Sequence, residues 1–476
     1  MNATDSSIAP RALAPAFLCD LEAAVGGDNL WSGPRLADRP WRDWSGAPAA
    51  MPLAVLMPRT PEAVAQALRA CHDHAMPVAV QGGLTGLAGG ANPRGDEVVL
   101  SLERLNAIEL LDAQGATAVV QAGVTLQALQ EAAQVHGLSF PLDLGARGSC
   151  HLGGNAATNA GGNRVLRFGM MRNLVLGLEV ALPDGRLLTM LDRVIKNNAG
   201  YDLKHLFIGS EGTLGVITRL SLSLVPQPGW TGTAMCAVPD FPAALALLRT
   251  AKATLPGLTA FELMWRGFLD AGARAIGAPP PFAEPAPLYV LMESVAGSET
   301  QGQAAFEHAL ERAMEEGLVQ DAVIAQSQAQ AAQLWAFREG VSELLSIHKP
   351  CAAFDVSVPI ERMDALVHEL SARLDAAYPA QSHLFFGHLG DGNLHLISGP
   401  FVSHEDLERA EAAVYACVGR FDGSISAEHG IGMVKRDFLG HSRDEAQIGL
   451  MRQLKGLLDP HGILNPGRIF EAAPCA

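Results

Sequence analysis

The sequence predicts an α+β fold with more than one domain, and three observations lead to this prediction. Strand, helix and strand patterns follow one another within residues 53–80, and further on strands and helices mix without a fixed order. Of the 476 residues, 49% are hydrophobic and 18% are charged. A chain of this length and composition has enough apolar side chains for two or three well-filled cores.

The first regular elements begin after a short N-terminal helix. The pattern predicts, in order, a helix over 16–25, irregular structure over 31–51, a strand over 53–57, a helix from Pro61 and a strand over 77–80. Thr60 before Pro61 indicates the helix start, because proline is favoured in the first helical turn. Together the last three elements form a β-α-β unit that runs directly into a glycine-rich loop.

The remaining elements fall on either side of a predicted domain boundary near 226–229. Before it we expect strands over 97–102, 118–122, 175–182 and 214–224, a helix over 125–135 and a turn at Asp184-Gly185. After it we expect strands over 232–238 and 287–293, helices over 240–252, 301–316, 323–347 and 444–458, and a tight loop at 465–467. The mixture of the two element types favours the α+β class.

Composition excludes several classes of function. A formal net charge of -16 without a Lys/Arg cluster disfavours a nucleic-acid partner. The seven cysteines are scattered and form no Cys-x-x-Cys pair, which indicates a reducing, cytoplasmic setting rather than a disulfide framework or a thiolate zinc site. Residues 1–15 lack the pattern of a signal peptide, and no apolar run reaches about 18 residues, so we expect no integral membrane segment.

Glycine-rich blocks at 82–95, 145–177 and 209–215 are candidate ligand-binding loops. Glycine permits unusual backbone angles and close approach, and such a loop can turn several N–H groups toward one anion. One loop alone is equally typical of a tight turn. Several loops rich in Ser, Thr and Asn within one domain favour an extended pyrophosphate with its ring systems. Their spacing does not fit the Rossmann fingerprint.

A candidate metal site lies in the stretch 384–395. If Asp391-Gly392 forms a two-residue hairpin turn, His388 and His395 oppose each other across two strands, with Asn393 on the same face. Glu428 completes a His-His-carboxylate set that suits zinc, iron or manganese, and His429 beside it can move a proton. The alternative from spacing alone is a pair of hydrogen-bonded core histidines without a metal.

Several motifs resemble one known family. They are Pro141–Gly145, Gly148–Asn155, Ala157–Gly162, Gly200–Leu203, Phe207–Gly215, Gly387–His395, Ser426–Gly430 and Asn465-Pro466. In this order, between about residues 40 and 470, they are similar to the FAD-linked D-2-hydroxyacid dehydrogenases. The flavin fold of that family is that of vanillyl-alcohol oxidase and p-cresol methylhydroxylase.

The resemblance implies a two-subdomain FAD-binding domain over 1–225, an α+β cap over 226–425 and a segment over 426–476 that returns to complete the active site and the flavin domain. FAD is expected to be held non-covalently, with His151 supporting the flavin pocket. The residues expected to bind it are Gln81, Gly82, Gly83, Leu84, Thr85, Gly86, Leu87, Pro141, Asp143, Gly145, Gly148, Ser149, Gly153, Gly154, Asn155, Thr158, Asn159, Gly161, Gly162, Glu211, Gly212, Gly215, Val216, Ile217 and Asn465.

The resemblance also implies roles in the active site. His388, His395 and Glu428 match the ligands of a divalent metal, usually zinc, and His429 matches the catalytic histidine. The expected substrate-binding residues are Arg338, Ser342, Lys349, Asn393 and His429. A metal in this set would orient the substrate and acidify its hydroxyl, His429 would take the proton, and hydride would pass from C2 to flavin N5. Without the resemblance, Arg338 would be read as a solvated charge on a helix.

The sequence departs from the family at one position. Ala353 precedes Phe354-Asp355, where glutarate-specific members carry a lysine, and the nearest lysine is Lys349. The expected substrate is therefore D-2-hydroxyglutarate if Lys349 compensates, and D-lactate or glycolate if it does not. A third alternative is a flavin-binding protein of the same fold without redox activity.

No haem motif or iron–sulfur cysteine set is present in the sequence. Reoxidation of the flavin is therefore expected to need a second protein, such as electron-transferring flavoprotein, or a quinone. A homodimer is also compatible with the sequence.

Overall fold

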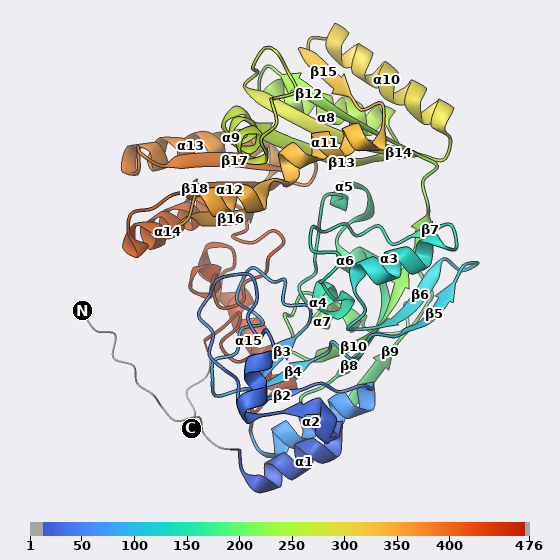
Figure 1. Ribbon diagram of the computed structural model, residues 1–476, viewed down its shortest axis with the longest axis vertical. Coiled ribbons are helices and arrows are strands. Elements are labelled where there is room, and N and C mark those ends of the chain that lie inside the picture. Colours follow the sequence, from blue (N-terminus) through green and yellow to red (C-terminus); the bar gives the residue numbers. More distant parts are fainter. Residues whose placement is uncertain (1–12, 472–476) are drawn as a thin grey trace.

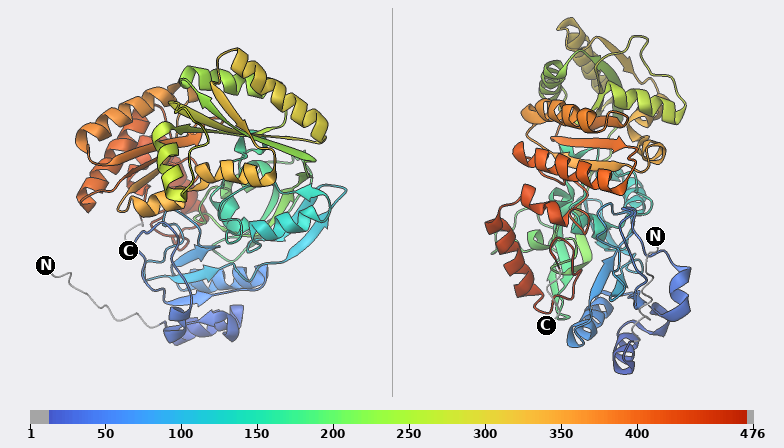
Figure 2. Two further views of the ribbon diagram at one scale, coloured as in Figure 1. Left: turned by 45° about the horizontal axis from the view of Figure 1, so that its top comes forward. Right: turned by 90° about the vertical axis from the view of Figure 1, so that its left-hand side faces the viewer.

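The computed structural model describes residues 13–471. Residues 1–12 and Cys475 lie outside this range, so the expectation of no signal peptide concerns residues that are largely not described. The sheets that precede residue 227 form the lower part of the molecule in Figure 1, and a seven-stranded sheet with its helices forms the upper part. The C-terminal segment returns to the lower part (Figure 2).

A four-stranded sheet opens the lower part, in the order β1-β2-β4-β3. Its strands are β1 (Leu30–Trp31), β2 (Ala54–Leu56), β3 (Val78–Gln81) and β4 (Val98–Ser101). Helix α2 (Pro61–Asp73) connects β2 and β3, and the Thr60 hydroxyl accepts a hydrogen bond from the Ala63 amide at 3.1 Å. The predicted β-α-β unit is confirmed, with β4 inserted between its two parallel strands. Helix α1 (Pro15–Val25), also predicted, packs against α2.

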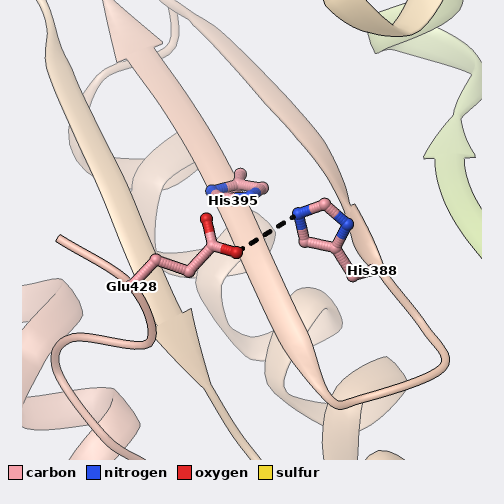
Figure 3. Close-up of side chains that lie close together, drawn as sticks. All are labelled: His388, His395 and Glu428. Carbon is pink, nitrogen blue, oxygen red and sulfur yellow. Dashed lines mark ion pairs between the residues drawn. The ribbon is translucent and has the colours of Figure 1, made fainter. Parts of the chain in front are cut away.

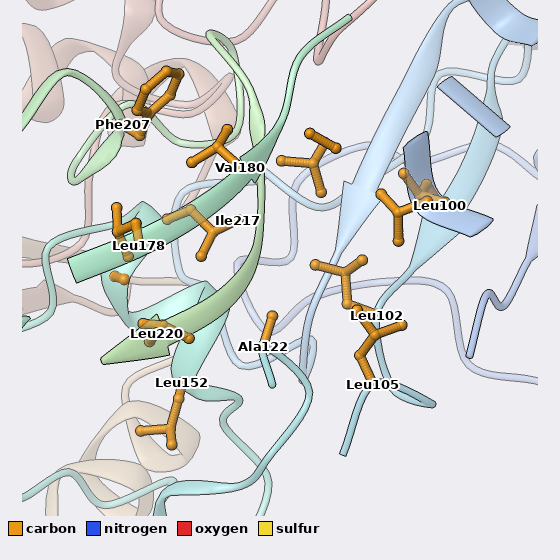
Figure 4. Packing of buried hydrophobic residues seen from close by; sticks show 14 of the residues in the cluster. Leu100, Leu102, Leu105, Ala122, Leu152, Leu178, Val180, Phe207, Ile217 and Leu220 are labelled. Atoms are coloured by element: carbon orange, nitrogen blue, oxygen red, sulfur yellow. The ribbon is translucent and has the colours of Figure 1, made fainter. Parts of the chain in front are cut away.

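A five-stranded antiparallel sheet follows, in the order β5-β6-β10-β8-β9. Its strands are β5 (Ile108–Asp112), β6 (Thr117–Gln121), β8 (Val175–Ala181), β9 (Leu187–Met190) and β10 (Val216–Ser223). One apolar core joins the two sheets, α2 and α3 (Leu126–Gln134). Figure 4 shows Leu100, Leu178 and Ile217 within this core.

The upper part is built on a seven-stranded antiparallel sheet, in the order β15-β12-β14-β13-β17-β18-β16. The strands are β12 (Trp230–Val238), β13 (Leu258–Trp265), β14 (Leu288–Ala296), β15 (Asp321–Ile324), β16 (Ala352–Ser357), β17 (Ser382–His388) and β18 (Asn393–Gly399). Helices α8 (Phe241–Thr254), α10 (Glu299–Glu315), α13 (Met363–Ala377) and α14 (His404–Arg420) cover one face. Helices α9 (Arg266–Ile276), α11 (Gln328–Glu339) and α12 (Val341–Ile347) cover part of the other.

The helix predicted over 323–347 is wrong at its start and in its middle. Residues up to Ile324 belong to edge strand β15, and the Ser327 hydroxyl caps α11 by accepting from the Gln330 amide at 3.2 Å. Gly340 then separates α11 from α12. A run of four apolar or small residues at 322–325 fits a strand as well as a helix, and its pairing with β12 decides between them.

The C-terminal segment is joined to the lower part through its backbone and through one buried ion pair. After α15 (Glu445–Leu458), Ile463 and Leu464 enter the first core, and the Val78 amide donates to the Ile463 carbonyl at 2.8 Å. Arg468 and Glu97, both with side chains 0% exposed, pair at 2.5 Å. The chain end is therefore a structural part of the first half of the molecule.

Within residues 13–471, no helix is both long and apolar enough to cross a membrane. The six described cysteines are all free.

Glu179 provides a stability test of the five-stranded sheet. Its carboxylate is 2% exposed and accepts hydrogen bonds from Thr218 at 2.9 Å and Arg219 at 2.6 Å. Burial by itself raises the pKa of Glu179, but the bonds from Arg219 and Thr218 outweigh it, and the pKa lies below its ordinary value. We expect Glu179→Gln to lower the free energy of unfolding by about 1.5–3 kcal/mol at pH 7 in urea denaturation.

The stability that Glu179 contributes depends on pH and is lost in acid. A depressed pKa in the folded state stabilises the protein above the unfolded pKa, about 4.3 for Glu, and this stabilisation is lost as the pH falls through the folded value. The difference in the free energy of unfolding between wild type and Glu179→Gln should therefore decrease as the pH is lowered. Glu109→Gln is the matched control, because Glu109 pairs with the same Arg219 at 3.2 Å but at an exposed position. Equal losses in the two variants at pH 7 would contradict the prediction.

Candidate active site

Four adjacent strands of the seven-stranded sheet direct polar side chains to one face. The pairing aligns Glu262 with His388, His388 with Asn393, and His395 with Asp355. Directly opposed residues of antiparallel strands point to the same side, and residues two apart on one strand share that side. Five polar side chains therefore gather on a face where their neighbours are apolar.

The predicted hairpin register is wrong. The loop between β17 and β18 has four residues, 389–392, so His388 opposes Asn393 and His395 opposes Phe386. Leu389 is fully buried in the apolar core between the seven-stranded sheet and helices α8, α10, α13 and α14. The amides of Asp391 and Gly392 donate to the His388 carbonyl at 3.3 and 3.2 Å. A two-residue turn would leave Leu389 in the strand. The two histidines are diagonal neighbours, with ring centroids 5.3 Å apart.

His388, His395 and Glu428 nevertheless come together as predicted (Figure 3). One donor atom from each lies within 4.8 Å of the other two, and His388 Nε2 is 3.9 Å from Glu428 Oε1. Two imidazole nitrogens and one carboxylate oxygen fit the ligand set of a catalytic zinc site or a similar divalent metal. The geometry of this chain thus suits the metal that the resemblance implies.

Burial and neighbouring charges set the protonation of this cluster. Burial, then the charges of His388 and Arg338, hold the pKa of His395 well below its ordinary value, so its imidazole is neutral. Burial also lowers the pKa of His388, but the Glu262 carboxylate reverses this and raises it to about 9. Burial raises the pKa of Glu428 to about 7. A divalent cation would compete with protons at His388 and Glu428.

His429 lies next to this cluster, with its side chain 24% exposed. Its backbone amide donates to Asp355 Oδ2 at 2.9 Å, and its Nδ1 is 3.8 Å from the same oxygen. Burial lowers the pKa of His429, and the charge of Asp355 only partly opposes this. The ring is therefore neutral near pH 7 and able to accept a proton.

Asn393 has one buried polar atom without a partner among the described residues. Its Nδ2 donates to Asp355 Oδ1 at 2.7 Å, whereas its Oδ1 is buried and accepts no hydrogen bond from the described residues. An ionised carboxylate only accepts, which fixes this orientation of the amide. Burial raises the pKa of Asp355, but His429 and Lys435 overcome this effect and hold it far below the ordinary range.

Arg338 also belongs to the cluster and is not solvated. It is 6% exposed, its Nε donates to Glu262 Oε2 at 2.7 Å, and its guanidinium carbon lies 4.6 Å from the centre of the Phe386 ring. Its Nη2 is 3.3 Å from His388 Nε2. A fixed guanidinium beside a metal-type site can bind a carboxylate.

The structure does not bring Ser342 and Lys349 into the cluster. Ser342 is exposed and donates to Glu343 at 2.8 Å. Lys349 is exposed, and His348 and Cys351, which flank Lys349-Pro350, pack beside Gly399 at the far end of β18. At about 3.3 Å per residue, Gly399 is roughly 13 Å along the strand from His395.

Sequence reasoning missed three charged residues of the cluster. Glu262 and Asp355 are 1% and 0% exposed, and the Lys435 ammonium donates to the carbonyls of Asp355 and Ile425 at 3.3 and 3.0 Å. A signal for Glu262 exists in the sequence, because a single acid interrupts the apolar run from Leu258 to Trp265. A buried acid of this kind needs a partner.

Several glycines of the predicted cofactor loops lie where a side chain would collide with neighbouring atoms of the protein. A Cβ on Gly83 would lie 1.9 Å from the Ser149 carbonyl oxygen, and one on Gly162 would lie 1.9 Å from that of Asp143. A Cβ on Gly153 would lie 2.5 Å from the Ala122 side chain. Gly145 and Gly154, in contrast, have nothing within 4 Å of a Cβ position. The first group permits close packing inside the domain, and the second leaves backbone that a ligand can approach.

Several side chains predicted to bind the cofactor are engaged within the protein. The Gln81 amide donates to the carbonyls of Trp41 and Ala91, both at 2.9 Å, and the Glu211 carboxylate accepts from the amides of Ile431 and Gly432, both at 2.8 Å. Other pairs of this kind are Asn465 with Val80 and Glu211, Asp143 with Arg147, Thr158 with Gly154, and Asn159 with Arg172.

The other predicted cofactor residues differ in exposure. The buried ones are Pro141, Asn155, Gly161, Gly212, Gly215, Val216 and Ile217. The partly exposed ones are Gly82, Leu84 and Thr85, and the exposed ones are Gly86, Leu87, Gly148 and Ser149. Val216 and Ile217 are part of the first core, so only their backbone is available to a ligand.

Comparison with known proteins defines the class of the fold. Residues 52–191 match the family model described as FAD binding domain, and residues 227–469 match the model described as FAD linked oxidases, C-terminal domain. The structure of p-cresol methylhydroxylase aligns with a TM-score of 0.75 at 16% identity, covering 97% of this chain and 98% of that chain. Alkyldihydroxyacetonephosphate synthase aligns with a TM-score of 0.76 at 16% identity, covering 98% and 88%. This is the predicted flavoprotein fold of the vanillyl-alcohol oxidase type.

Two relatives are similar along most of their length. D-2-hydroxyglutarate dehydrogenase of Xanthomonas citri pv. viticola is 43% identical over 460 residues, covering 95% of this chain and 97% of the relative. The mitochondrial D-2-hydroxyglutarate dehydrogenase of Bos taurus is 42% identical over 456 residues, covering 95% and 83%. The chain belongs to the FAD-linked oxidase family that includes the D-2-hydroxyglutarate dehydrogenases, as its motifs predicted.

The contact between the two glycine loops gives a prediction. Gly83→Ala should lower the free energy of unfolding by about 1–3 kcal/mol, because the added Cβ meets backbone that cannot rotate away. The measurement is thermal denaturation, with bound flavin followed by its visible absorbance. Gly86→Ala is the control, because its Cβ would meet only Asp43 Oδ2 at 3.6 Å. Equal melting temperatures for the two variants would disprove the steric explanation.

Proposed function

We propose that the protein is an FAD-dependent dehydrogenase that oxidises D-2-hydroxyglutarate to 2-oxoglutarate. The observation that carries the proposal is the gathering of His388, His395, Glu428, His429 and Arg338 at one face of the upper sheet. The named relatives at 42–43% identity support the substrate. When bound, FAD supplies the hydride acceptor.

In this proposal a divalent metal, zinc, is bound by His388, His395 and Glu428. The neutral imidazole of His395 and the mixed nitrogen and oxygen donors support this role. The residues would hold the cation where the hydroxyl and carboxylate of a 2-hydroxy acid can reach it, so the substrate is oriented before it reacts.

His429 is proposed as the base that takes the hydroxyl proton. Its lowered pKa supports this role, because the imidazole is then free to accept a proton at neutral pH. The buried Oδ1 of Asn393 is proposed to accept a hydrogen bond from the substrate. Arg338 is proposed to bind a substrate carboxylate through Nη1, since its Nε is already bonded to Glu262 and its Nη2 lies 3.3 Å from His388 Nε2. A metal and an arginine in one cluster suit a dianionic acid.

We also propose that residues 1–225 and 426–476 hold the cofactor, while residues 226–425 form a cap. Support comes from Ile463 and Leu464, which share the core of the lower part, and from Asn465, which bonds to Val80 and Glu211. The backbone at Gly145 and Gly154 is the proposed approach surface for FAD. Electron-transferring flavoprotein or a quinone is the proposed acceptor of the electrons.

A second candidate function is the oxidation of a short D-2-hydroxy acid, such as D-lactate or glycolate. One observation favours it: Lys349, the lysine nearest in sequence to Ala353, lies at the end of β18 away from His395. A substrate without a second carboxylate has no need of a lysine at that position.

The substrate is tested by anaerobic reduction of the bound flavin. We expect D-2-hydroxyglutarate to bleach the absorbance near about 450 nm, a band that belongs to the flavin itself, faster than L-2-hydroxyglutarate, D-lactate, D-malate or glycolate. The L-enantiomer is the control for stereospecificity. Faster bleaching by D-lactate or glycolate would select the second candidate, and no bleaching by any acid would overturn the dehydrogenase proposal.

The metal is tested by removal and by substitution. Chelator should abolish flavin reduction, and zinc should restore it. His395→Ala should bind zinc more than about 100-fold more weakly, since loss of a ligand exceeds the 10–100-fold effect typical of its supporting residues. Metal content and calorimetric titration measure this. His383→Ala is the control, because His383 lies on the neighbouring strand and bonds to Ser398 at 2.9 Å, outside the cluster. Equal zinc affinity in both variants would contradict the assignment.

A further inference from the structure

One buried carboxylate joins the two halves of the proposed site. Glu262, on β13, is 1% exposed and stands opposite His388 in the sheet register. Its Oε1 accepts a hydrogen bond from His388 Nδ1 at 2.7 Å, and its Oε2 accepts from Arg338 Nε at 2.7 Å. Each oxygen therefore serves a different residue, one a proposed metal ligand and the other a proposed carboxylate-binding group.

The first contact determines which nitrogen of His388 is free. A carboxylate that is bonded to a guanidinium can only accept, so His388 Nδ1 must carry the hydrogen. In the neutral ring the lone pair is then on Nε2, which lies 3.9 Å from Glu428 Oε1 and 3.3 Å from Arg338 Nη2. Metal-binding histidines commonly have such a carboxylate on their second nitrogen, where it fixes the tautomer and the ring orientation.

The second contact determines which edge of Arg338 is free. Because Nε is bonded to Glu262 and the guanidinium lies over the Phe386 ring at 4.6 Å, the plane of the group is fixed. Of the two Nη groups, Nη2 lies 3.3 Å from His388 Nε2, so Nη1 is the group left for a substrate carboxylate. Glu262 thus determines which nitrogen of His388 can bind a metal and which edge of Arg338 can bind a substrate.

We propose that Glu262 is a positioning residue that couples metal binding at His388 to carboxylate binding at Arg338. The inference rests on the function proposed above. It assigns Glu262 no contact with the reacting atoms. Its consequence is that the two binding events share one hydrogen-bonded unit, and a change at Glu262 disturbs at least one of them.

Glu262→Gln tests this coupling because glutamine has one acceptor and one donor end. If its oxygen serves Arg338, its NH₂ faces His388 Nδ1 and favours the tautomer with hydrogen on Nε2, which cannot bind a cation. If its oxygen serves His388, its NH₂ opposes the Nε–H of Arg338. No single orientation satisfies both partners. We therefore expect zinc or product binding to weaken by about 10–100-fold, the range typical of groups that support a metal ligand.

Two measurements on the flavin-loaded protein separate these effects. Calorimetric titration of zinc into chelator-treated protein reports on His388, and titration of 2-oxoglutarate, followed by the flavin spectrum, reports on Arg338. Glu262→Asp keeps two acceptor oxygens and should lie closer to wild type in both. Glu293→Gln is the matched control: Glu293 is 5% exposed on the neighbouring strand and bonds to Thr259 and Arg164, not to His388 or Arg338.

The outcomes distinguish this inference from the function on which it rests. Wild-type affinity of Glu262→Gln for both zinc and 2-oxoglutarate, or an equal loss in Glu293→Gln, would overturn the role of Glu262 alone. A wild-type protein that binds no zinc would overturn the proposed function together with the inference. If Glu262→Gln does not fold, ¹⁵N-histidine NMR of the zinc-loaded wild type decides, because a hydrogen on His388 Nε2 would refute the proposal and one on Nδ1 would support it.

Discussion

The site depends on one buried charge, the carboxylate of Asp355. It is 0% exposed, and an ionised group at such depth is stable only when hydrogen bonds and opposite charge surround it. The Asn393 amide and the backbone amides of Glu428 and His429 supply the hydrogen bonds, and Lys435 lies 3.8 Å away. Because these partners come from the sheet and from the C-terminal segment, compensation of one charge fixes that segment against the sheet.

The same segment is fixed from its other side by the lower part of the molecule. Glu211, in the glycine-rich block before β10, accepts the amides of Ile431 and Gly432 only two and three residues after His429. The segment around His429 is therefore held by two carboxylates, the buried Asp355 of the upper part and the partly buried Glu211 of the lower part. Glu262 does the same for His388 and Arg338 within the sheet. These carboxylates only accept hydrogen bonds, so they determine the orientation of the N–H groups that surround the site.

Local signals were readable from the sequence, and pairings between distant residues were not. Thr60 caps α2 through a bond three residues away, so its role follows from its neighbours. The metal-type set was also found, because His388 and His395 lie close in sequence and the family motifs include Glu428. The hairpin register was wrong because burial of Leu389, not the Asp-Gly pair, sets the loop length. Glu262 was missed because its partner His388 is 126 residues away.

The two kinds of glycine in the loops have different consequences for how the sequence can vary over evolution. Gly83, Gly153 and Gly162 are constrained by packing inside the protein, because a Cβ there would collide with neighbouring atoms. Selection for folding alone is therefore enough to retain them. Gly145 and Gly154 have open space at the Cβ position, so only a bound ligand would constrain them. A descendant that lost its cofactor but kept its fold would keep the first three and drift at the other two. Substitutions at Gly145 and Gly154 would then reveal the loss of cofactor binding before the fold itself changed.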